Sequence, residues 1–274
     1  VVIRASALDE IGGLPQDSIT EDFAASILLH HRKWRGIYLT DVLATGLGPV
    51  DITAYFAQQR RWATGVFAVL RRYGRLIFLP GSSKGALTSA QRIQYFLSCT
   101  HYLSGVCNLV YLLVPLMYFY IGTCAVRPVA PSLLLGYLLP YLLLALLAFR
   151  HASRGRMHWR GTTLGFGSFP VTVASLLSVL CGQRVRFVVT AKSRRKTGRS
   201  WESLLPHIVA FALCLGALKL SFSASGDPFL VFLSGLWLLQ MTIMLASLLK
   251  VALGKDQKSR VVEEEKVVVH ANTR

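Results

Sequence analysis

The chain has 274 residues, of which 53% are hydrophobic and 16% are charged. A soluble domain has roughly 45–50% apolar and about 25% charged residues, so this composition argues against an ordinary soluble domain and indicates an integral membrane protein. The formal net charge of +17 fits either a nucleic-acid binder or the excess of Lys and Arg on the cytoplasmic side of a membrane. The basic residues flank apolar runs, and no nucleic-acid-binding motif accompanies them. We therefore expect a lipid bilayer as partner and no nucleic acid.

Residues 1–90 mix polar and apolar positions and are predicted to be the C-terminal part of a cytoplasmic domain. In chain order we expect a short helix ended by two glycines, a helix with acids in its first turn, a short strand, and a helix followed by Gly74. Their expected bounds are 5–11, 21–31, 34–39 and 51–73. Ser18 or Thr20 could cap the second helix. The first residues do not form a signal peptide, and we interpret the chain as a piece of a longer protein.

Residues 91–250 are predicted to be a membrane region with about four spans. A spanning helix needs about 20 mainly apolar residues. Four stretches meet this length: 102–124, 130–149, 204–224 and 228–250. A fifth apolar run, 162–181, contains Pro170 and has basic flanks. We interpret it as an interfacial or re-entrant helix, with a fifth span as the alternative.

Positive charge predicts the orientation of these spans. Segment 150–203 is rich in Arg and Lys and has a single acid, Glu202, while the turns between paired spans are almost uncharged. The charge excess places the N-terminal part, this segment and the charged tail 251–274 on the cytoplasmic side of a cell (plasma or inner) membrane, in a multi-pass protein. The five cysteines show no metal-binding spacing, so we predict no metal site in this chain.

Two polar clusters ahead of the spans could carry chemistry. Glu21 and Asp22 stand at a predicted helix start, where acids often only complement the helix dipole; alternatively, one of them is a general base. Gln58 and Arg61 share a helix face, and a guanidinium suits pyrophosphate, while Trp62 offers a flat face to a sugar ring. The alternative is a basic amphipathic helix whose Trp lies in the membrane interface.

Three motifs follow one another along the chain. Thr20-Glu21-Asp22 precedes Gln58-Gln59-Arg60-Arg61-Trp62, and Phe187-Val188-Val189-Thr190-Ala191-Lys192 lies in the later basic loop. They resemble the TED, QxxRW and FxVTxK motifs of the processive family 2 glycosyltransferases, and bacterial cellulose synthase catalytic subunits are most similar. The resemblance covers nearly all of residues 1–250.

This resemblance implies a fold and a set of site residues. The fold is the α/β C-terminal part of a GT-A-type glycosyltransferase domain, followed by an α-helical transmembrane region that forms a polymer channel. Asp22 would deprotonate the acceptor sugar, and Glu21 and Thr20 would shape its surroundings. The nucleotide pyrophosphate would contact Gln58 and Arg61, while the acceptor terminus would stack on Trp62. A gating loop, 183–203, would close over the donor with four residues: Phe187, Val189, Thr190 and Lys192.

The implied reaction is repeated, inverting transfer from a UDP-sugar, UDP-glucose in the case of cellulose, to a growing polysaccharide that is exported through the spans. The implied enzyme is a UDP-forming hexosyltransferase whose partners are the donor, the acceptor chain and accessory export subunits. The complete enzyme would need Mg²⁺ or Mn²⁺. The chain contains no DxD sequence, so we expect the metal and uridine sites to lie before Val1 and this chain alone to be inactive.

The sequence also departs from the family pattern. Lys33 and Ser193 stand where the family usually has glycine, although neither replaces a proposed catalytic group. Related synthases of chitin, hyaluronan, mannan or curdlan share QxxRW-type motifs, so the sugar stays open. A membrane transporter or scaffold without chemistry is the alternative from another class, and a basic nucleic-acid binder is a third.

Overall fold

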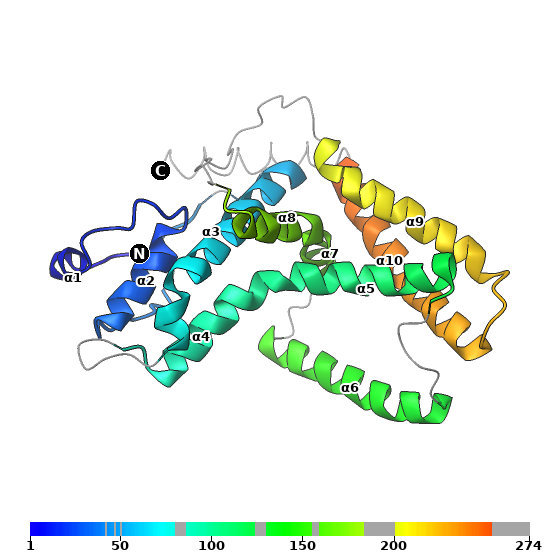
Figure 1. Cartoon of the computed structure of the whole chain (residues 1–274). Helices are drawn as coiled ribbons and strands as arrows, with labels where there is room; N and C mark the ends of the chain where they lie inside the picture. The colour runs from blue at the N-terminus through cyan, green and yellow to red at the C-terminus, as the bar shows by residue number, and fades with distance from the viewer. Residues whose placement is uncertain are drawn as a thin grey trace, which may run out of the picture. The chain divides into compact units, whose positions relative to one another are not determined.

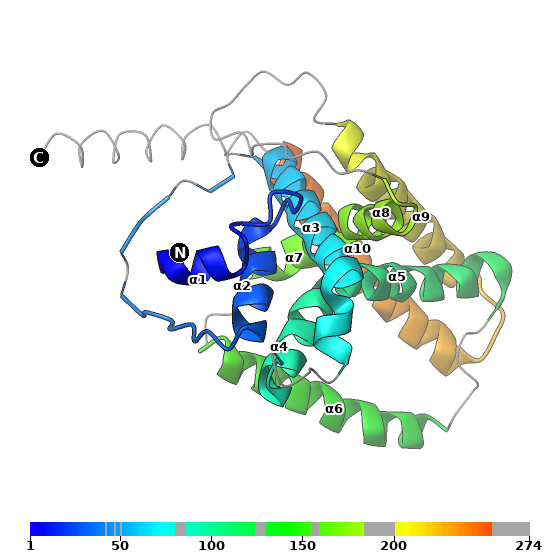
Figure 2. The same cartoon turned by 60° about the vertical axis from the view of Figure 1, so that its left-hand side comes forward.

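The computed structural model describes residues 1–41, 43–46, 48–49, 51–79, 86–123, 130–154, 159–183 and 201–253. All regular structure in these residues is helical (Figures 1 and 2). The chain divides into two compact units. Unit 1 comprises residues 1–106 and 170–198, and unit 2 comprises residues 107–169 and 199–274.

Unit 1 contains the helices of residues 1–90, which were predicted to be cytoplasmic, together with helical elements from the predicted membrane region. They are α1 (Ala5–Glu10), α2 (Glu21–His31), α3 (Ile52–Phe78), α4 (Ser89–Thr100), a 3-10 turn (His101–Leu103) and nearly all of α8 (Phe169–Leu180). The predicted first two helices are confirmed. Gly12 and Gly13 have φ angles of 79° and 91°, and this left-handed backbone ends α1 as glycine pairs commonly do.

Helix α3 is longer than the sequence predicted. Asp51 caps its start, because its carboxylate accepts a hydrogen bond of 2.7 Å from the Ala54 amide. The prediction that Gly74 follows its end was wrong. Gly74 is a buried helical residue, and burial of Ile77 beyond it offsets the roughly 1 kcal/mol that an interior glycine costs. The guanidinium of Arg92 then caps the end by donating to the Ile77 (2.7 Å) and Phe78 carbonyls.

The predicted strand at 34–39 was also wrong. Residues 35–40 are irregular, and no strand occurs among the described residues. A strand needs a neighbour to accept and donate its backbone hydrogen bonds, and the described chain offers none. Ile37 and Tyr38 are 86% and 90% exposed, so the apolar alternation that suggested a strand is not used for packing here. The α/β character expected of residues 1–90 is therefore not seen.

Helix α2 is held in unit 1 by an apolar cluster shared with α3 and α4. Ala24 and Ile27 of α2 are fully buried in it, against Val69 of α3 and Tyr95 and Cys99 of α4. Complete burial of such side chains contributes about 1.5–3 kcal/mol for a residue of the size of isoleucine. This cluster fixes the position of α2, and with it the start of α2, against α3.

Unit 2 is built from the apolar helices. They are α5 (Ser104–Ile121), α6 (Pro131–Ala152), α7 (Trp159–Gly167), a 3-10 turn (Glu202–Leu204), α9 (Leu205–Ser221) and α10 (Pro228–Leu253). Helices α9 and α10 lie side by side around fully buried residues such as Cys214, Leu238 and Leu245. His207 of α9 is also fully buried, and its Nε2 lies 2.6 Å from the Gly167 carbonyl oxygen. No residue of α6 is buried.

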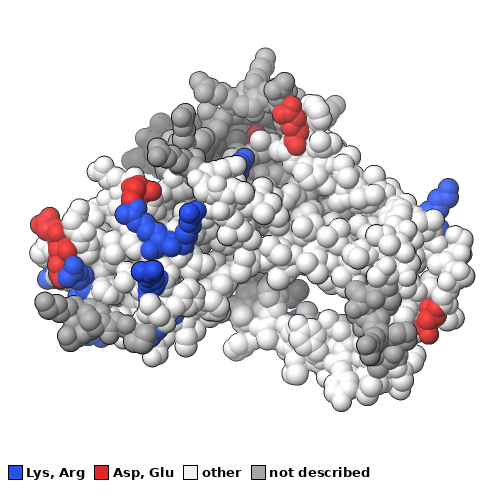
Figure 3. Space-filling view, in the orientation of Figure 1, with Lys and Arg blue, Asp and Glu red and all other residues white. Residues whose placement is uncertain are grey.

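Five helical stretches of the described chain are long and apolar enough to cross a membrane: 89–121, 131–152, 159–180, 202–221 and 228–253. Four of them contain or overlap the predicted spans, and the chain is a membrane protein. The stretch 159–180 is interrupted at Ser168, between α7 and α8. Its predicted interfacial location is not tested by its length and composition and stays a prediction. In Figure 3, charged side chains gather over α1 to α3, whereas the visible surface of α6 is uncharged.

Candidate active site

The Thr20-Glu21-Asp22 motif lies at the start of α2, in unit 1. Thr20 is the N-cap residue, but its hydroxyl caps no backbone amide, contrary to one of our sequence predictions. Glu21 and Asp22 are exposed in the first turn. The Oδ1 atom of Asp22 accepts a hydrogen bond of 2.8 Å from the Phe23 amide. This hydrogen bond fixes the orientation of the carboxylate at the start of α2.

The residues of the Gln58–Trp62 motif lie on α3. At about 100° per residue, Gln58, Arg61 and Trp62 fall within about 60° of the direction of Gly65 around the helix axis. They precede Gly65 along the axis by about 10, 6 and 4–5 Å, at 1.5 Å per residue. Trp62 is 39% exposed, so its ring is accessible at the surface. We call the side of α3 that carries these four residues the motif face.

The motif face is the side of α3 that meets the start of α2. A Cβ atom added to Gly65 would lie 2.8 Å from Thr20 Oγ1 and 3.0 Å from Ile19 Cγ1, with the Thr20 methyl closer still. Such distances are below normal contact, so only glycine fits at this position. Thr20 is 7% exposed, and its Oγ1 has no hydrogen-bond partner among the described residues. The structure thus places Thr20 of the first motif against α3 at Gly65, three residues after Trp62.

The opposite side of α3 packs against α8. Ala63 and Phe67, about 160° from the direction of Gly65, are buried in a cluster with Val179 of α8. The hydroxyl of Ser175 donates to the Val171 carbonyl at 2.8 Å, and its oxygen lies 3.4 Å from the Arg60 carbonyl oxygen of α3. Helix α8 therefore supports α3 from behind and leaves the motif face uncovered by α8.

The end of α8 is well defined. Gly182 has a φ of 70°, and the amides of Gly182 and Gln183 donate to the carbonyls of Val179 and Ser178 at 3.1 and 3.0 Å. This pair of bonds is the Schellman arrangement that ends helices at glycine. The guanidinium of Arg71 on α3 adds a hydrogen bond of 2.7 Å to the Val179 carbonyl. The predicted gating-loop residues Phe187, Val189, Thr190 and Lys192 lie outside the described residues.

Two contacts near the motifs were not predicted from the sequence. His30 Nδ1 and the Tyr95 hydroxyl lie 2.7 Å apart and join the end of α2 to α4. Burial lowers the pKa of the His30 imidazole below its usual value. The indole nitrogen of Trp34 donates to Glu10 at 2.6 Å. The role of Gly65 was also missed, although an isolated glycine inside a helical pattern often marks a close approach.

The described residues contain no group of three or more His, Cys, Asp and Glu side chains that could hold a metal ion. Glu21 and Asp22 are the carboxylates of the motif, and two adjacent exposed carboxylates do not make a closed set of ligands for Mg²⁺ or Mn²⁺. The described residues thus do not fit the divalent metal that the resemblance implies.

Comparison with known proteins assigns a family to the chain. Residues 1–150, more than half of the chain, match the family described as Glycosyl transferase family group 2. The chain belongs to this glycosyltransferase family. Among its relatives are cellulose synthases, so the predicted resemblance to a cellulose-synthase-like enzyme is confirmed.

Three of these relatives show the extent of the similarity. The cellulose synthase catalytic subunit (UDP-forming) of Komagataeibacter sucrofermentans is 25% identical over 227 residues, which cover 79% of this chain and 28% of the relative. The subunit of the same name from Pseudomonas fluorescens is 28% identical over 223 residues, covering 78% of this chain and 29% of the relative. Cellulose synthase 1 of Komagataeibacter xylinus is 28% identical over 199 residues, which cover 70% of this chain and 12% of the relative. The matched part thus spans less than a third of these relatives.

Proposed function

We propose that the protein is a membrane-embedded processive glycosyltransferase that extends a polysaccharide from a UDP-sugar, inverts the anomeric centre and exports the chain through its spans. The observation that supports this most is the contact of Gly65 with Thr20. Through it, the residues proposed to handle the acceptor and those proposed to handle the pyrophosphate lie on adjoining surfaces of α2 and α3. If the acidic cluster on α2 and the Gln/Arg/Trp cluster on α3 had unrelated roles, we would not expect a glycine at the position where α3 meets the start of α2.

In this proposal Asp22 is the general base. Its carboxylate takes the proton of an acceptor hydroxyl while that oxygen attacks the anomeric carbon of the donor. The bond between the anomeric carbon and the diphosphate oxygen breaks, the new glycosidic bond forms, and UDP leaves with the electron pair. A single displacement of this kind inverts the anomeric carbon. Thr20 is buried at the N-cap of α2 and Glu21 is exposed beside Asp22, and in this proposal both shape the surroundings of the base.

The other side of the proposed site stabilises the leaving group. The guanidinium of Arg61 can offer two parallel N–H groups to pyrophosphate oxygens. Gln58, one turn earlier on the motif face, adds an uncharged donor. Stabilising the charge that develops on the leaving diphosphate is commonly a large contribution to catalysis. Trp62 is partly exposed on the same face, where its ring can stack on the acceptor sugar.

We propose UDP-glucose as the donor and a β-1,4-linked glucan as the product, because the relatives quoted above are named as cellulose synthases, two of them as UDP-forming catalytic subunits. We further propose that residues 1–90 contribute helices to a GT-A-type domain on the cytoplasmic side, and that residues 183–203 form the gating loop. The spans would conduct the polymer, and accessory subunits would assist its export.

The experiment is a donor panel. The full-length protein in proteoliposomes is incubated with radiolabelled UDP-glucose, UDP-N-acetylglucosamine and UDP-glucuronate, and insoluble product is counted and digested with linkage-specific hydrolases. We expect incorporation from UDP-glucose and release of the label by a β-1,4-glucanase. Incorporation from another donor would show that the substrate is that UDP-sugar and not UDP-glucose. Absence of incorporation from every donor would contradict the proposed function.

A further inference from the structure

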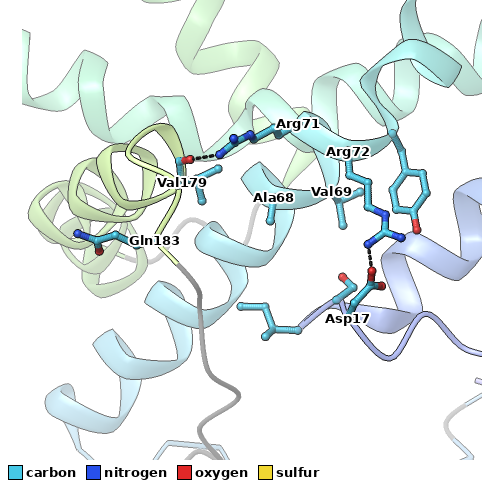
Figure 4. Close-up of a pocket in the computed structure, with 11 residues that line it drawn as sticks. Asp17, Ala68, Val69, Arg71, Arg72, Val179 and Gln183 are labelled. Carbon is cyan, nitrogen blue, oxygen red and sulfur yellow. Dashed lines mark hydrogen bonds and ion pairs between the residues drawn. The ribbon is translucent and has the colours of Figure 1, made fainter.

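Unit 1 has a pocket of about 380 Å³ that uses none of the motif residues (Figure 4). Its polar side chains come from three segments: Asp17 and Ser18 before α2, Arg71, Arg72 and Tyr73 on α3, and, after α8, Gln183, which is the first residue of the proposed gating loop. Apolar side chains also line it, among them those of Ile19, Val69 and Val179. We propose that this pocket binds a phosphate group, carried by a small solute or by a lipid headgroup.

The first argument is the state of Arg72. Its guanidinium forms an ion pair with Asp17, and the two side chains are 57% and 51% exposed. An ion pair this exposed contributes little to stability. Because the ion pair is weak, an anionic ligand in the pocket could displace the Asp17 carboxylate and take its place at the Arg72 guanidinium. A phosphate group offers more oxygens and more charge than the carboxylate and accepts bidentate bonds from arginine.

The second argument is the state of Arg71. One of its N–H groups is used in the hydrogen bond to the Val179 carbonyl, which fixes the guanidinium beside the end of α8. A guanidinium has five N–H donors, so others are available to a ligand. Figure 4 shows Arg71 and Arg72 reaching toward opposite sides of the pocket, Arg71 toward Val179 and Arg72 toward Asp17. A phosphate group in the pocket could therefore be reached by a guanidinium group from either side.

The third argument is the balance of charge and surface. Arg71 and Arg72 oppose the single carboxylate of Asp17 among the lining residues, so the pocket carries an excess of positive charge. The apolar lining suits a ligand that has an apolar or ring portion beside its phosphate, such as a nucleoside phosphate or the glycerol region of a phospholipid. A bare inorganic anion would leave that lining unused.

The test uses two variants that remove opposite charges. The full-length protein in detergent is titrated with inorganic phosphate and with a nucleoside monophosphate, and binding is measured by ³¹P NMR. Because Arg72 would supply charge-assisted bonds to the phosphate, Arg72→Gln should weaken binding by about tenfold. Asp17→Asn should strengthen it several-fold, because it removes the competitor for Arg72. Arg75→Gln is the matched control, since it removes an exposed positive charge from the same helix without lining the pocket.

A second arm separates the two sources of phosphate. Nanodiscs of phosphatidylcholine alone are compared with nanodiscs that also contain phosphatidic acid, and lipid retained by each variant is quantified. Solute binding with the expected pattern of variants assigns the site to a soluble phosphate, and retention of phosphatidic acid with that pattern assigns it to a lipid. Absence of binding in both arms would overturn the proposal. It would also be overturned if Arg72→Gln and Arg75→Gln had equal effects, because binding would then reflect net charge.

Discussion

Replacement of Gly65 by alanine tests the contact of α3 with Thr20 of the first motif. The added methyl would lie 2.8 Å from Thr20 Oγ1 and still closer to the Thr20 methyl. Alanine is a better helix former than glycine by about 1 kcal/mol, whereas overpacking a buried site costs typically about 1–3 kcal/mol. We therefore expect a net loss of roughly 0–2 kcal/mol in the free energy of unfolding.

The effect on activity should be much larger than the effect on stability. Thr20 is buried and directly precedes Glu21 and Asp22, so we expect relief of the overlap to displace the start of α2. A displacement of about 1 Å in a catalytic site can cost on the order of a hundredfold in rate. We expect Gly65→Ala to lower the initial rate of UDP-sugar incorporation by at least about tenfold, with the protein still inserted in the membrane.

Two further variants make this prediction specific. Gly74→Ala is the matched control on the same helix, because its Cβ would meet only ordinary contacts, the nearest at 3.7 Å. It should keep full activity and gain up to about 1 kcal/mol of stability. Thr20→Ser, which removes the methyl but keeps the hydroxyl, should restore part of the rate in the Gly65→Ala background. Full activity of Gly65→Ala alone would refute the reasoning.

Three other variants test the surroundings of the site by chemical denaturation. Phe67→Ala should lose about 3–5 kcal/mol, because Phe67 is 4% exposed and packs where α8 meets α3; a loss below 1 kcal/mol would contradict that packing. Lys33→Gly should gain up to about 1 kcal/mol, because Lys33 has a φ of 67°, and an unchanged or lower stability would count against strain there. Burial lowers the pKa of His30 below its usual value of 6.5. The stabilisation that neutral His30 provides is therefore complete above pH 6.5. It is lost as the pH falls below that value, because the unfolded chain binds the proton more readily than the folded one. His30→Gln should flatten this dependence, and an unaltered pH profile would contradict it.

The sequence predicted the helices well where local signals agree. The acids at 21–22 and the glycines at 12–13 mark helix ends through dipole and backbone preferences that act within one turn. Gly74 misled the prediction because its neighbour Ile77 is buried by contacts that are distant in sequence. The alternation at 34–39 misled it because a strand requires a partner that a single segment cannot reveal.

In the candidate site, too, features set by local spacing were predicted and features set by contacts distant in sequence were not. Helical spacing alone was enough to place Gln58 and Arg61 on one face. The contact of Gly65 with Thr20 depends on how α2 packs against α3, and that packing arises from residues such as Ala24 and Val69 spread over the chain. Lys33 stands where the family usually has glycine. Only the structure explains this preference, because the backbone at Lys33 is left-handed and glycine adopts that conformation without strain. The gating-loop residues stay predictions.

The central claim is that Asp22 is the base of a glycosyltransferase site. The most direct measurement is the rate at which the full-length protein, reconstituted in proteoliposomes, incorporates labelled UDP-sugar when Asp22 is replaced by asparagine. Asp9→Asn, at an exposed position of α1, is the matched control. We predict that Asp22→Asn abolishes incorporation at unchanged protein level while Asp9→Asn retains it. A fully active Asp22→Asn protein would contradict the account.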